Sequence, residues 1–288
     1  EEREKIYIPL NSITAVLKMS KRLKLSDSDG VGGGAHIVWF LYTGQDVSEI
    51  PRDARVRHVR IDPSVKVIRK GAFEGCDQLV EVVLCEGLER IEEGAFYGCK
   101  FLKSMKIPSS VKEIGDCAFR ECYQLVEVEL CEGLEQIGGA VFMFCKSLRR
   151  IKVPSTVKVI DKRAFYCCHQ LVQVELCNGL ESIGEFAFFR CSSLPNIKIP
   201  ASVKAIYQLA FQHCNQLMGV ELCDEIKFMH RAAFEFSSSL RSIVIPPGKG
   251  LNCNGGGHHD LLKLCSRQAL IEALKCRFNE LPIHKLCY

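Results

Sequence analysis

The sequence predicts a right-handed solenoid, in which successive turns of the chain stack into a parallel β-sheet with short helical turns on the opposite side. Three strict periodicities predict this fold class. Phenylalanine recurs every 23 residues, as Phe73, Phe96, Phe119, Phe142, Phe165, Phe188, Phe211 and Phe234. Cysteine follows three residues later, as Cys76, Cys99, Cys122, Cys145, Cys168, Cys191 and Cys214, before Ser237 takes the last place. Leucine follows after three more, as Leu79, Leu102, Leu125, Leu148, Leu171, Leu194, Leu217 and Leu240.

Each repeat is predicted to contain one short strand and a return segment. The strand alternates apolar and polar residues, as in Val128-Glu129-Leu130, which is typical of a strand with one buried face. A single repeat cannot bury its apolar side, so stacking must place Leu on Leu and Phe on Phe in interior ladders. About eight turns, spaced at about 4.8 Å, give an array of roughly 40 Å. The predicted fold is therefore a leucine-rich-repeat solenoid.

A second period of 46 residues is superimposed on the first. The strand ends alternate between two sets, Pro108, Pro154, Pro200 and Pro246 in one and Cys85, Cys131, Cys177 and Cys223 in the other. Proline at a strand end stops the hydrogen-bond ladder and favours a turn. In the cysteine set, Gly87, Gly133 and Gly179 are predicted to adopt a positive φ.

Three regions are predicted along the chain. Residues 1–55 form an N-terminal segment and cap, residues 56–246 form the solenoid of about eight repeats, and residues 247–288 form a Gly-rich hinge followed by a C-terminal helix. A solenoid needs a cap because its first turn otherwise exposes the apolar interior. The apolar run His36–Tyr42 is expected to be a capping strand.

Helices are expected on both sides of the repeats. An amphipathic helix is predicted around Ser12–Leu25, and a second from Asp260, a suitable N-cap, to Phe278 after the hinge at 247–257. Residues Leu281–Cys287 resemble the opening of an ankyrin-type helix pair, with Leu281 in place of the usual Thr. A short packed tail helix is the alternative for this segment.

Composition narrows the classes of function. Lys and Arg number 38 against 34 Asp and Glu, a formal charge of +4, which is far from the concentrated basic patch of a nucleic-acid-binding protein. No apolar run reaches the length of a membrane-spanning helix, so neither nucleic acid binding nor membrane insertion is predicted. The 17 cysteines are odd in number and mostly follow the repeat. They are expected to be reduced and buried, which favours an intracellular location over the cell surface or secretion.

Residues 122–142 read CYQLVEVELCEGLEQIGGAVF. This unit resembles the BspA-like, or Treponema pallidum-type, leucine-rich repeats, with Cys131 where that pattern has proline. The resemblance covers residues 56–246. It implies the leucine-rich-repeat fold and a role in adhesion or protein binding. The segment from YTGQDV to LCEGLERI is also similar to large repeat families of diatoms.

No catalytic residue, cofactor or metal site is predicted. The repeating thiols lie 23 residues apart and lack the close ligand pairs of a zinc site. A second group matches no known zinc spacing and comprises Cys253, Cys265, Cys276, Cys287, His258, His259 and His284. His58, His169, His213 and His230 fall on different turns, so none is expected beside a nucleophile. Cys117 and Cys167 lie outside the ladder and are expected to be exposed.

The outward strand positions predict a neutral wall. One row reads Arg60, Val83, Lys106, Glu129, Lys152, Glu175, Lys198, Glu221 and Val244. Basic and acidic side chains alternate by turn, so neighbouring charges are expected to pair across the strands. On the opposite side of each turn, Met143, Tyr166 and Phe189 are consecutive. They form either an outer apolar stripe or a cluster packed against the neighbouring turn.

Charge thins out over two successive turns from Val172 onward. A partly apolar patch is predicted there, made of Val172, Gln173, Pro195, Asn196, Met218 and Gly219. Contiguous apolar surface rimmed by polar groups tends to mark a contact site, so a protein partner is expected to dock on these residues. Ordinary variation among repeats is the alternative explanation.

The sequence as a whole predicts a protein-binding repeat scaffold and not an enzyme. The first alternative is a cell-surface adhesion protein of BspA-like type, which the family resemblance allows. The second is a thiol-dependent enzyme, such as a ubiquitin ligase fused to repeats, which would need an exposed cysteine of lowered pKa.

Overall fold

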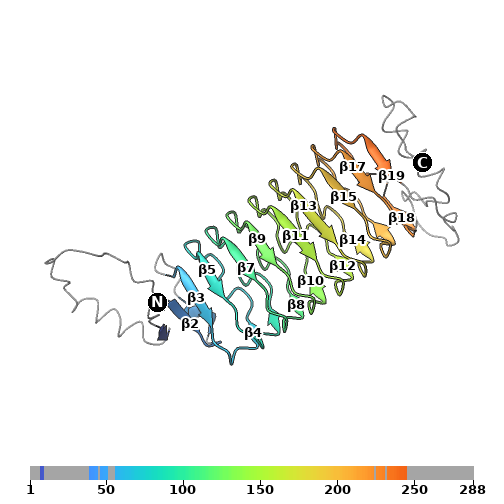
Figure 1. The fold of residues 1–288 in the computed structure, drawn as a ribbon. Coiled ribbons are helices and arrows are strands. Elements are labelled where there is room, and N and C mark those ends of the chain that lie inside the picture. Colours follow the sequence, from blue (N-terminus) through green and yellow to red (C-terminus); the bar gives the residue numbers. More distant parts are fainter. Residues whose placement is uncertain are drawn as a thin grey trace, which may run out of the picture.

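The computed structural model describes residues 7–9, 39–44, 46–50, 56–223, 225–230 and 232–244. The repeats form an elongated parallel β-solenoid, in which each turn lies directly beside the next from β2 at one end to β19 at the other (Figure 1). The expected helices at Ser12–Leu25 and Asp260–Phe278, the hinge at 247–257 and the segment Leu281–Cys287 lie outside the described residues. Those expectations, and the boundaries of the three regions, stay predictions.

Two rows of strands run along the array. The long row comprises β1 (Tyr7–Pro9), β2 (Trp39–Tyr42), β3 (His58–Ile61), β5 (Glu81–Val83), β7 (Ser104–Lys106), β9 (Glu127–Glu129), β11 (Arg150–Val153), β13 (Gln173–Leu176), β15 (Asn196–Lys198), β17 (Gly219–Glu221) and β19 (Ser242–Val244). The second row comprises β4 (Val67–Ile68), β6 (Arg90–Ile91), β8 (Glu113–Ile114), β10 (Gln136–Ile137), β12 (Val159–Ile160), β14 (Ser182–Ile183), β16 (Ala205–Ile206) and β18 (Phe228–Met229).

The register of the repeats is the one that the 23-residue period predicts. Paired residues are 23 positions apart, as in Val59 with Val82 and Ile197 with Val220. β2 pairs in parallel with β3 and so extends the sheet ahead of the first repeat. This is the place where the sequence predicts a capping strand.

Proline interrupts the long row at one point. The strand-to-strand hydrogen bonds of the long row form three separate sheets, which run from β1 to β5, from β7 to β13 and from β15 to β19. The second break therefore falls between β13 and β15. In neighbouring turns the N–H of Val172 donates to the carbonyl of Arg149 at 2.9 Å, and the N–H of Met218 donates to the carbonyl of Pro195 at 2.7 Å. Pro195 has no N–H to continue this ladder toward Val172, so the sheet divides at that turn.

Phenylalanine and leucine form the continuous interior ladders that the sequence predicts. The Phe rings from Phe73 to Phe234 stack with centroids 5.0 to 5.5 Å apart and planes within 18° of parallel. Each ring from Phe73 to Phe211 is fully buried, as are the ladder leucines from Leu79 to Leu217. One uninterrupted core therefore runs along the array and joins the turns.

The ladder thiols line this interior, as predicted. From Cys99 onward each Sγ donates a weak hydrogen bond to the carbonyl of the phenylalanine in the preceding repeat, at 3.1 to 3.3 Å. Ser237, which ends the row, donates to the carbonyl of Phe211 at 2.8 Å. Burial raises the pKa of Cys99, Cys145 and Cys191 well above the usual thiol value. These cysteines therefore act as small apolar residues with one satisfied donor.

The prediction of helical turns opposite the long row is wrong. In the part of the chain that the structure describes, the 3-10 turn Val47–Glu49 is the only helix. The segment between each second-row strand and the next long-row strand, here called the turn side, places alternate N–H groups toward the following repeat. Gly71, Phe73 and Gly75 donate to the carbonyls of Glu93, Ala95 and Tyr97. Only the alternate N–H groups, as those of Ala72 and Glu74, donate to carbonyls three residues back, so no continuous helical ladder forms.

The glycine prediction is correct at two of its three positions. Gly87 has a φ of +93° and Gly179 a φ of +121°, whereas Gly133 does not lie in the left-handed region. A close approach requires glycine at Gly133 instead, because a Cβ there would lie 2.4 Å from the carbonyl oxygen of Ser109. Both constraints arise in loops that follow a strand ending in cysteine, because these loops lie close to the loop of the preceding turn.

Substitution of Gly179 by alanine is expected to be far more damaging than the same change at Gly75. Both residues have a positive φ, which costs a Cβ-bearing residue about 1–2 kcal/mol. At Gly75 a Cβ would meet nothing within 4 Å, but at Gly179 it would lie 2.0 Å from the carbonyl oxygen of Ser155. The backbone clash should raise the loss to about 3 kcal/mol or more. Urea unfolding of both variants tests this, and equal losses would contradict the clash.

Candidate interaction surfaces

The outer face of the long row carries the charge pairs that the alternation predicts. Lys106 lies 3.6 Å from Glu129, and the pair in β15 and β17, Lys198 and Glu221, lies at 3.1 Å. The intervening pair, Lys152 and Glu175, lies at 3.9 Å. All six side chains are about half exposed or more, so each pair contributes only about 0–1 kcal/mol. Their main effect is to neutralise this face.

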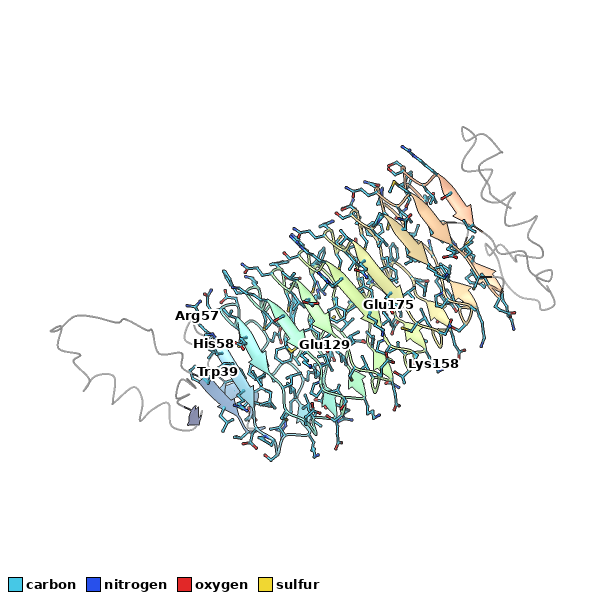
Figure 2. All side chains as sticks on the ribbon, in the orientation of Figure 1. Trp39, Arg57, His58, Glu129, Lys158 and Glu175 are labelled. Carbon is cyan, nitrogen blue, oxygen red and sulfur yellow. The ribbon has the colours of Figure 1, made fainter. Side chains whose placement is uncertain are left out.

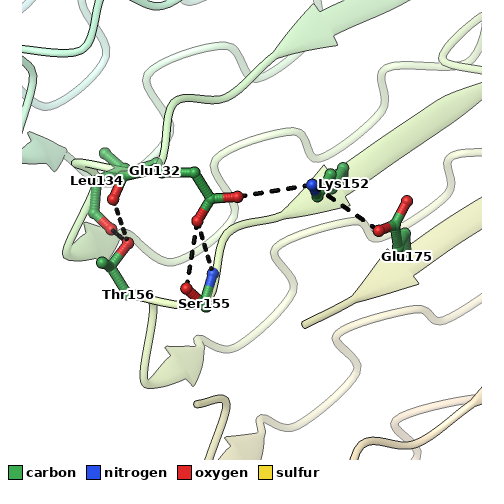
Figure 3. A network of polar contacts seen from close by, with 6 residues as sticks. All are labelled: Glu132, Leu134, Lys152, Ser155, Thr156 and Glu175. Carbon is green, nitrogen blue, oxygen red and sulfur yellow. Dashed lines mark hydrogen bonds and ion pairs between the residues drawn. The ribbon is translucent and has the colours of Figure 1, made fainter. Parts of the chain in front are cut away.

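Lys152 also joins a polar network at the strand ends (Figure 3). Its Nζ lies 3.6 Å from Glu132, whose carboxylate accepts from the N–H and hydroxyl of Ser155 at 3.3 and 3.2 Å. The Thr156 hydroxyl donates to the carbonyls of Glu132 and Leu134. The network joins the loop that follows Pro154 to the loop that follows Cys131 in the preceding turn. Figure 2 shows Glu129 and Glu175 on the same face, with Lys158 at the second row.

The structure brings the six residues of the predicted patch together on three successive turns. Gln173, Asn196 and Gly219 open the strands β13, β15 and β17, and Val172, Pro195 and Met218 directly precede them. The sheet-face patch is defined as these six residues: Val172, Gln173, Pro195, Asn196, Met218 and Gly219. Val172 is 49% and Met218 46% exposed, among the larger exposures of apolar side chains in the described chain.

Gly219 makes room for a neighbouring side chain within this patch. Asn196 pairs with Gly219 across the sheet, and a Cβ on Gly219 would lie 2.7 Å from Asn196 Oδ1. The Asn196 amide therefore leans over the glycine, and the surface between Val172 and Met218 stays low. Exposed arginines border it, with Arg149 and Arg150 on the preceding turn and Arg241 on the following one. The patch is thus apolar in the middle and cationic at its rim.

Aromatic side chains gather on the turn side. The aromatic ridge is defined as Phe144, Tyr166, Phe186, Phe189, His213 and Phe236. Tyr166 stacks on Phe189 with centroids 4.6 Å apart and planes 12° from parallel, and His213 stacks on Phe236 at 5.1 Å. Edge contacts of 5.6 to 5.7 Å link the remaining members. The rings therefore form one contiguous row across five turns.

The ridge resolves the two alternatives for Met143, Tyr166 and Phe189. Phe189 is only 8% exposed and packs against the neighbouring turn, and Tyr166 and Met143 are half-buried. Sequence periodicity missed Phe144, Phe186 and Phe236, because the first repeats have glycine at the corresponding places, as at Gly75 and Gly94. A comparison restricted to the left-handed turn positions would have found them.

Cations lie over these rings. The guanidinium of Arg163 is 5.3 Å from the centroid of Phe186, and that of Arg190 is 5.4 Å from Phe189. Farther along the turn side, the ammonium of Lys146 is 4.9 Å from the ring of Tyr123. Such contacts contribute about 0.5–1 kcal/mol at exposed sites. The contacts of Arg163 and Arg190 hold these two side chains against the ridge.

A groove of about 760 Å³ lies along the second row. Its charged lining comprises Glu92, Glu93, Glu113, Asp116, Glu135, Asp161, Lys70, Arg90 and Lys158. Several of these charges pair within the groove, as in Lys70 with Glu93 at 2.7 Å and Arg90 with Glu92 at 3.2 Å. Asp116 is engaged as well, because its Oδ1 accepts from the N–H of Gly139 at 2.7 Å. The lining holds six carboxylates against three cations, so the groove keeps an acidic excess.

The two cysteines outside the ladder differ from each other. Cys117 is half-buried, but the expectation of exposure is wrong for Cys167, which is 4% exposed. Burial raises the pKa of the Cys167 thiol, although the positive charges of Arg190 and Lys146 lower it in part. A raised pKa is the opposite of what a nucleophilic thiol needs.

Among the described residues, no group of three or more His, Cys, Asp or Glu side chains is placed to hold a metal ion. The second Cys and His group, from Cys253 to Cys287, lies outside those residues. Within the same ranges, the structure contains no helix of the length and hydrophobicity needed to span a membrane.

Comparison with known proteins places the repeats in a family. The family model for the BspA type leucine-rich repeat region, which matches in six copies, covers residues 52–171 and 135–252. The chain belongs to the BspA-type leucine-rich repeat family. No curated protein matches it. The similarity to diatom repeat families stays a prediction.

Solved structures of leucine-rich repeat proteins are similar to this BspA-type chain. One from Bacteroides ovatus is 26% identical, with a TM-score of 0.53 over 67% of this chain and 56% of its own length. The Treponema pallidum leucine-rich repeat protein is 30% identical, with a TM-score of 0.47 over 58% of this chain and 76% of its own. The chain thus spans little more than half of the Bacteroides protein.

Proposed function

We propose that this BspA-type repeat chain is a protein-binding scaffold whose partner docks on the sheet-face patch. One observation carries the proposal: two apolar side chains that are nearly half exposed, Val172 and Met218, lie two turns apart on either side of Pro195, on a face that also carries neutralising charge pairs. Apolar surface rimmed by polar groups is typical of contact sites. The apolar centre with its arginine rim suits a partner of matching shape with acidic groups at its edge.

The histidines support a binding role over catalysis. His169 Nδ1 lies 3.1 Å from the carbonyl oxygen of Arg190, and His230 Nδ1 accepts from the N–H of Ala232 at 3.1 Å. His213 is packed between Phe189 and Phe236. His58 lies against Trp39 with ring centroids 5.3 Å apart, and burial lowers its pKa. Each of these rings is engaged in contacts within its own turn or with a neighbouring turn.

The thiols support the same proposal. Burial raises the pKa of every ladder cysteine from Cys99 to Cys214, which disfavours a thiolate nucleophile. The ladder cysteines from Cys99 to Cys214 have free thiols. This supports a compartment in which thiols stay reduced, so an intracellular location is part of the proposal.

Charge introduced into the sheet-face patch is expected to abolish partner binding. In affinity capture with the full chain as bait, proteins retained by the wild type should be depleted about tenfold or more with the double variant Val172→Glu and Met218→Glu, because a buried unpaired carboxylate is strongly unfavourable at an interface. Val126→Glu is the matched control, since Val126 occupies the same outward row and is 41% exposed. Retention of the same proteins by the double variant would overturn the proposal.

A further inference from the structure

The side chains of the aromatic ridge come largely from residues with a strained backbone. Among the residues that the structure describes, eleven other than glycine have φ between +52° and +64°, and they are Cys117, Glu121, Ala140, Phe144, Arg163, Cys167, Phe186, Arg190, Leu209, His213 and Phe236. The first turns have Gly71, Gly75, Gly94 and Gly98 at the corresponding places. Bulky residues rarely adopt this conformation. Where they persist, the strain points to a functional role of the side chain.

Packing alone does not account for these residues. A Cβ built on Gly75 meets nothing within 4 Å, and one on Gly94 meets only the Tyr97 side chain at 3.8 Å. Side chains at such positions therefore project from the turn side. In the later turns they include Phe144, Arg163 and Phe186, and Phe236 is 63% exposed. Glycine adopts this backbone conformation at a lower free energy than other residues do. The later turns therefore retain large side chains at a cost in backbone free energy.

The cations of this surface lack acidic partners within the described chain. Arg163, Arg190 and Lys146 are exposed, and no described carboxylate lies within 4.0 Å of their charged nitrogens. The carboxylate of Glu121 is engaged by Arg120 at 3.4 Å and Tyr123 at 3.1 Å. A guanidinium that lies over a ring keeps its in-plane N–H groups available. These groups are suited to carboxylates.

We propose that the aromatic ridge, with Arg163, Arg190 and Lys146, binds an extended acidic peptide segment of a partner protein. The inference rests on the proposed protein-binding function but assigns a second face, separate from the sheet-face patch. Carboxylates of the peptide would meet the two guanidinium groups and the ammonium. Its apolar side chains would lie against Phe186 and Phe236. The ridge spans five turns, about 19 Å, which matches about six residues of extended chain.

Single-stranded nucleic acid fits this surface less well. A stacking platform for bases needs exposed ring faces. Here the ring faces are partly occupied, because Tyr166 stacks on Phe189, His213 stacks on Phe236, and Arg163 lies over Phe186. A peptide uses the outward N–H groups and ring edges that remain. The observations therefore favour a protein ligand.

Fluorescence anisotropy with a labelled peptide of repeating Glu-Glu-Phe units and the full chain tests this proposal. The double variant Arg163→Gln and Arg190→Gln should weaken peptide binding about tenfold or more, because it removes two charge-assisted contacts. The matched control is Arg149→Gln and Arg150→Gln, which removes two exposed arginines at the rim of the sheet-face patch and should leave peptide binding unchanged. Lysine at 163 and 190 keeps the charge but not the planar stacking, and should give an intermediate affinity.

Three results would overturn the proposal: no binding of the peptide by the wild type, equal binding by the glutamine double variant at 163 and 190, or tighter binding of an oligothymidylate of equal length. A circular dichroism spectrum and melting temperature like those of the wild type verify that each variant folds. Loss of peptide binding in the 149 and 150 variant would also count against the ridge. Failure of the Val172 and Met218 variant to release captured proteins would overturn the sheet-face proposal alone, since that variant leaves the ridge intact.

Discussion

Replacement of Phe165 by alanine is expected to lower the free energy of unfolding by about 3–5 kcal/mol, because it opens a cavity in the middle of the phenylalanine ladder. The Phe165 ring is fully buried and stacks on Phe142 at 5.5 Å and Phe188 at 5.0 Å. Neighbouring turns can collapse into such a gap only by breaking the register of the strands on both sides. Urea unfolding followed by circular dichroism measures the loss.

Two control variants make this prediction sharp. Phe234→Ala lies near the end of the described ladder, where the ring is 6% exposed and stacks on Phe211, and it should cost less than Phe165→Ala. Phe101→Ala, at a residue that is 40% exposed, should change stability by about 1 kcal/mol or less. Because each turn of a solenoid contacts only its neighbours, Phe165→Ala should also broaden the transition. Equal losses for Phe165→Ala and Phe101→Ala would contradict the interior ladder.

The buried thiols are expected to make the protein unfold in mild alkali. Burial raises the pKa of Cys214 from the ordinary 9.0 to about 12, and it raises the pKa values of five further ladder thiols. The unfolded chain then releases protons that the folded chain holds, so stability is complete below pH 9 and falls as the pH rises above it. At about pH 10 each such thiol accounts for a loss of about 1.4 kcal/mol. Six thiols lose about 8 kcal/mol, which is comparable with the whole stability of a domain.

A serine variant isolates the thiol contribution. Ser237 already occupies the ladder position in the last repeat and donates to Phe211, so Cys214→Ser can keep the hydrogen bond to Phe188 while removing the titrating group. The drop in unfolding free energy between pH 8 and pH 10 should be about 1.4 kcal/mol smaller in this variant than in the wild type. The comparison uses differences between two pH values, so any cost of the substitution itself cancels. An unchanged drop would show that the Cys214 thiol does not titrate with unfolding.

The repeats and their register could be predicted because strict periodicity leaves little freedom. A 23-residue step fixes which residues stack, so the burial of Phe165, the interior position of Cys145 and the pairing of Lys198 with Glu221 all follow from it. The six residues of the sheet-face patch come together for the same reason. None of these inferences needs knowledge of the backbone between strands, since each concerns side chains that repeat at one position per turn.

The turn side could not be predicted, because its geometry depends on backbone dihedral angles that residue types leave ambiguous. Gly71 and Gly75 suggest left-handed positions, but Arg163 and Cys167 occupy the same places in a later turn and do not suggest them. A sequence such as RAFYCC is equally compatible with one helical turn. Hydrogen bonding to the next repeat, as from Phe165 to the carbonyl of Ala187 at 2.7 Å, decides between the two. The burial of Cys167 cannot be predicted for the same reason, because it depends on the geometry of this turn.

The alternation of charged rungs on the long row also constrains how a chain of this kind can change in length. Removal of one repeat would bring Lys106 beside Lys152, and like charges directly opposite each other are destabilising. Removal of two repeats would bring Lys106 beside Glu175, so that neighbouring charged side chains would still have opposite signs. Loops that follow a proline and loops that follow a cysteine would likewise continue to alternate along the array. Insertion or deletion of repeats is therefore expected to be tolerated best in steps of two turns, which is 46 residues.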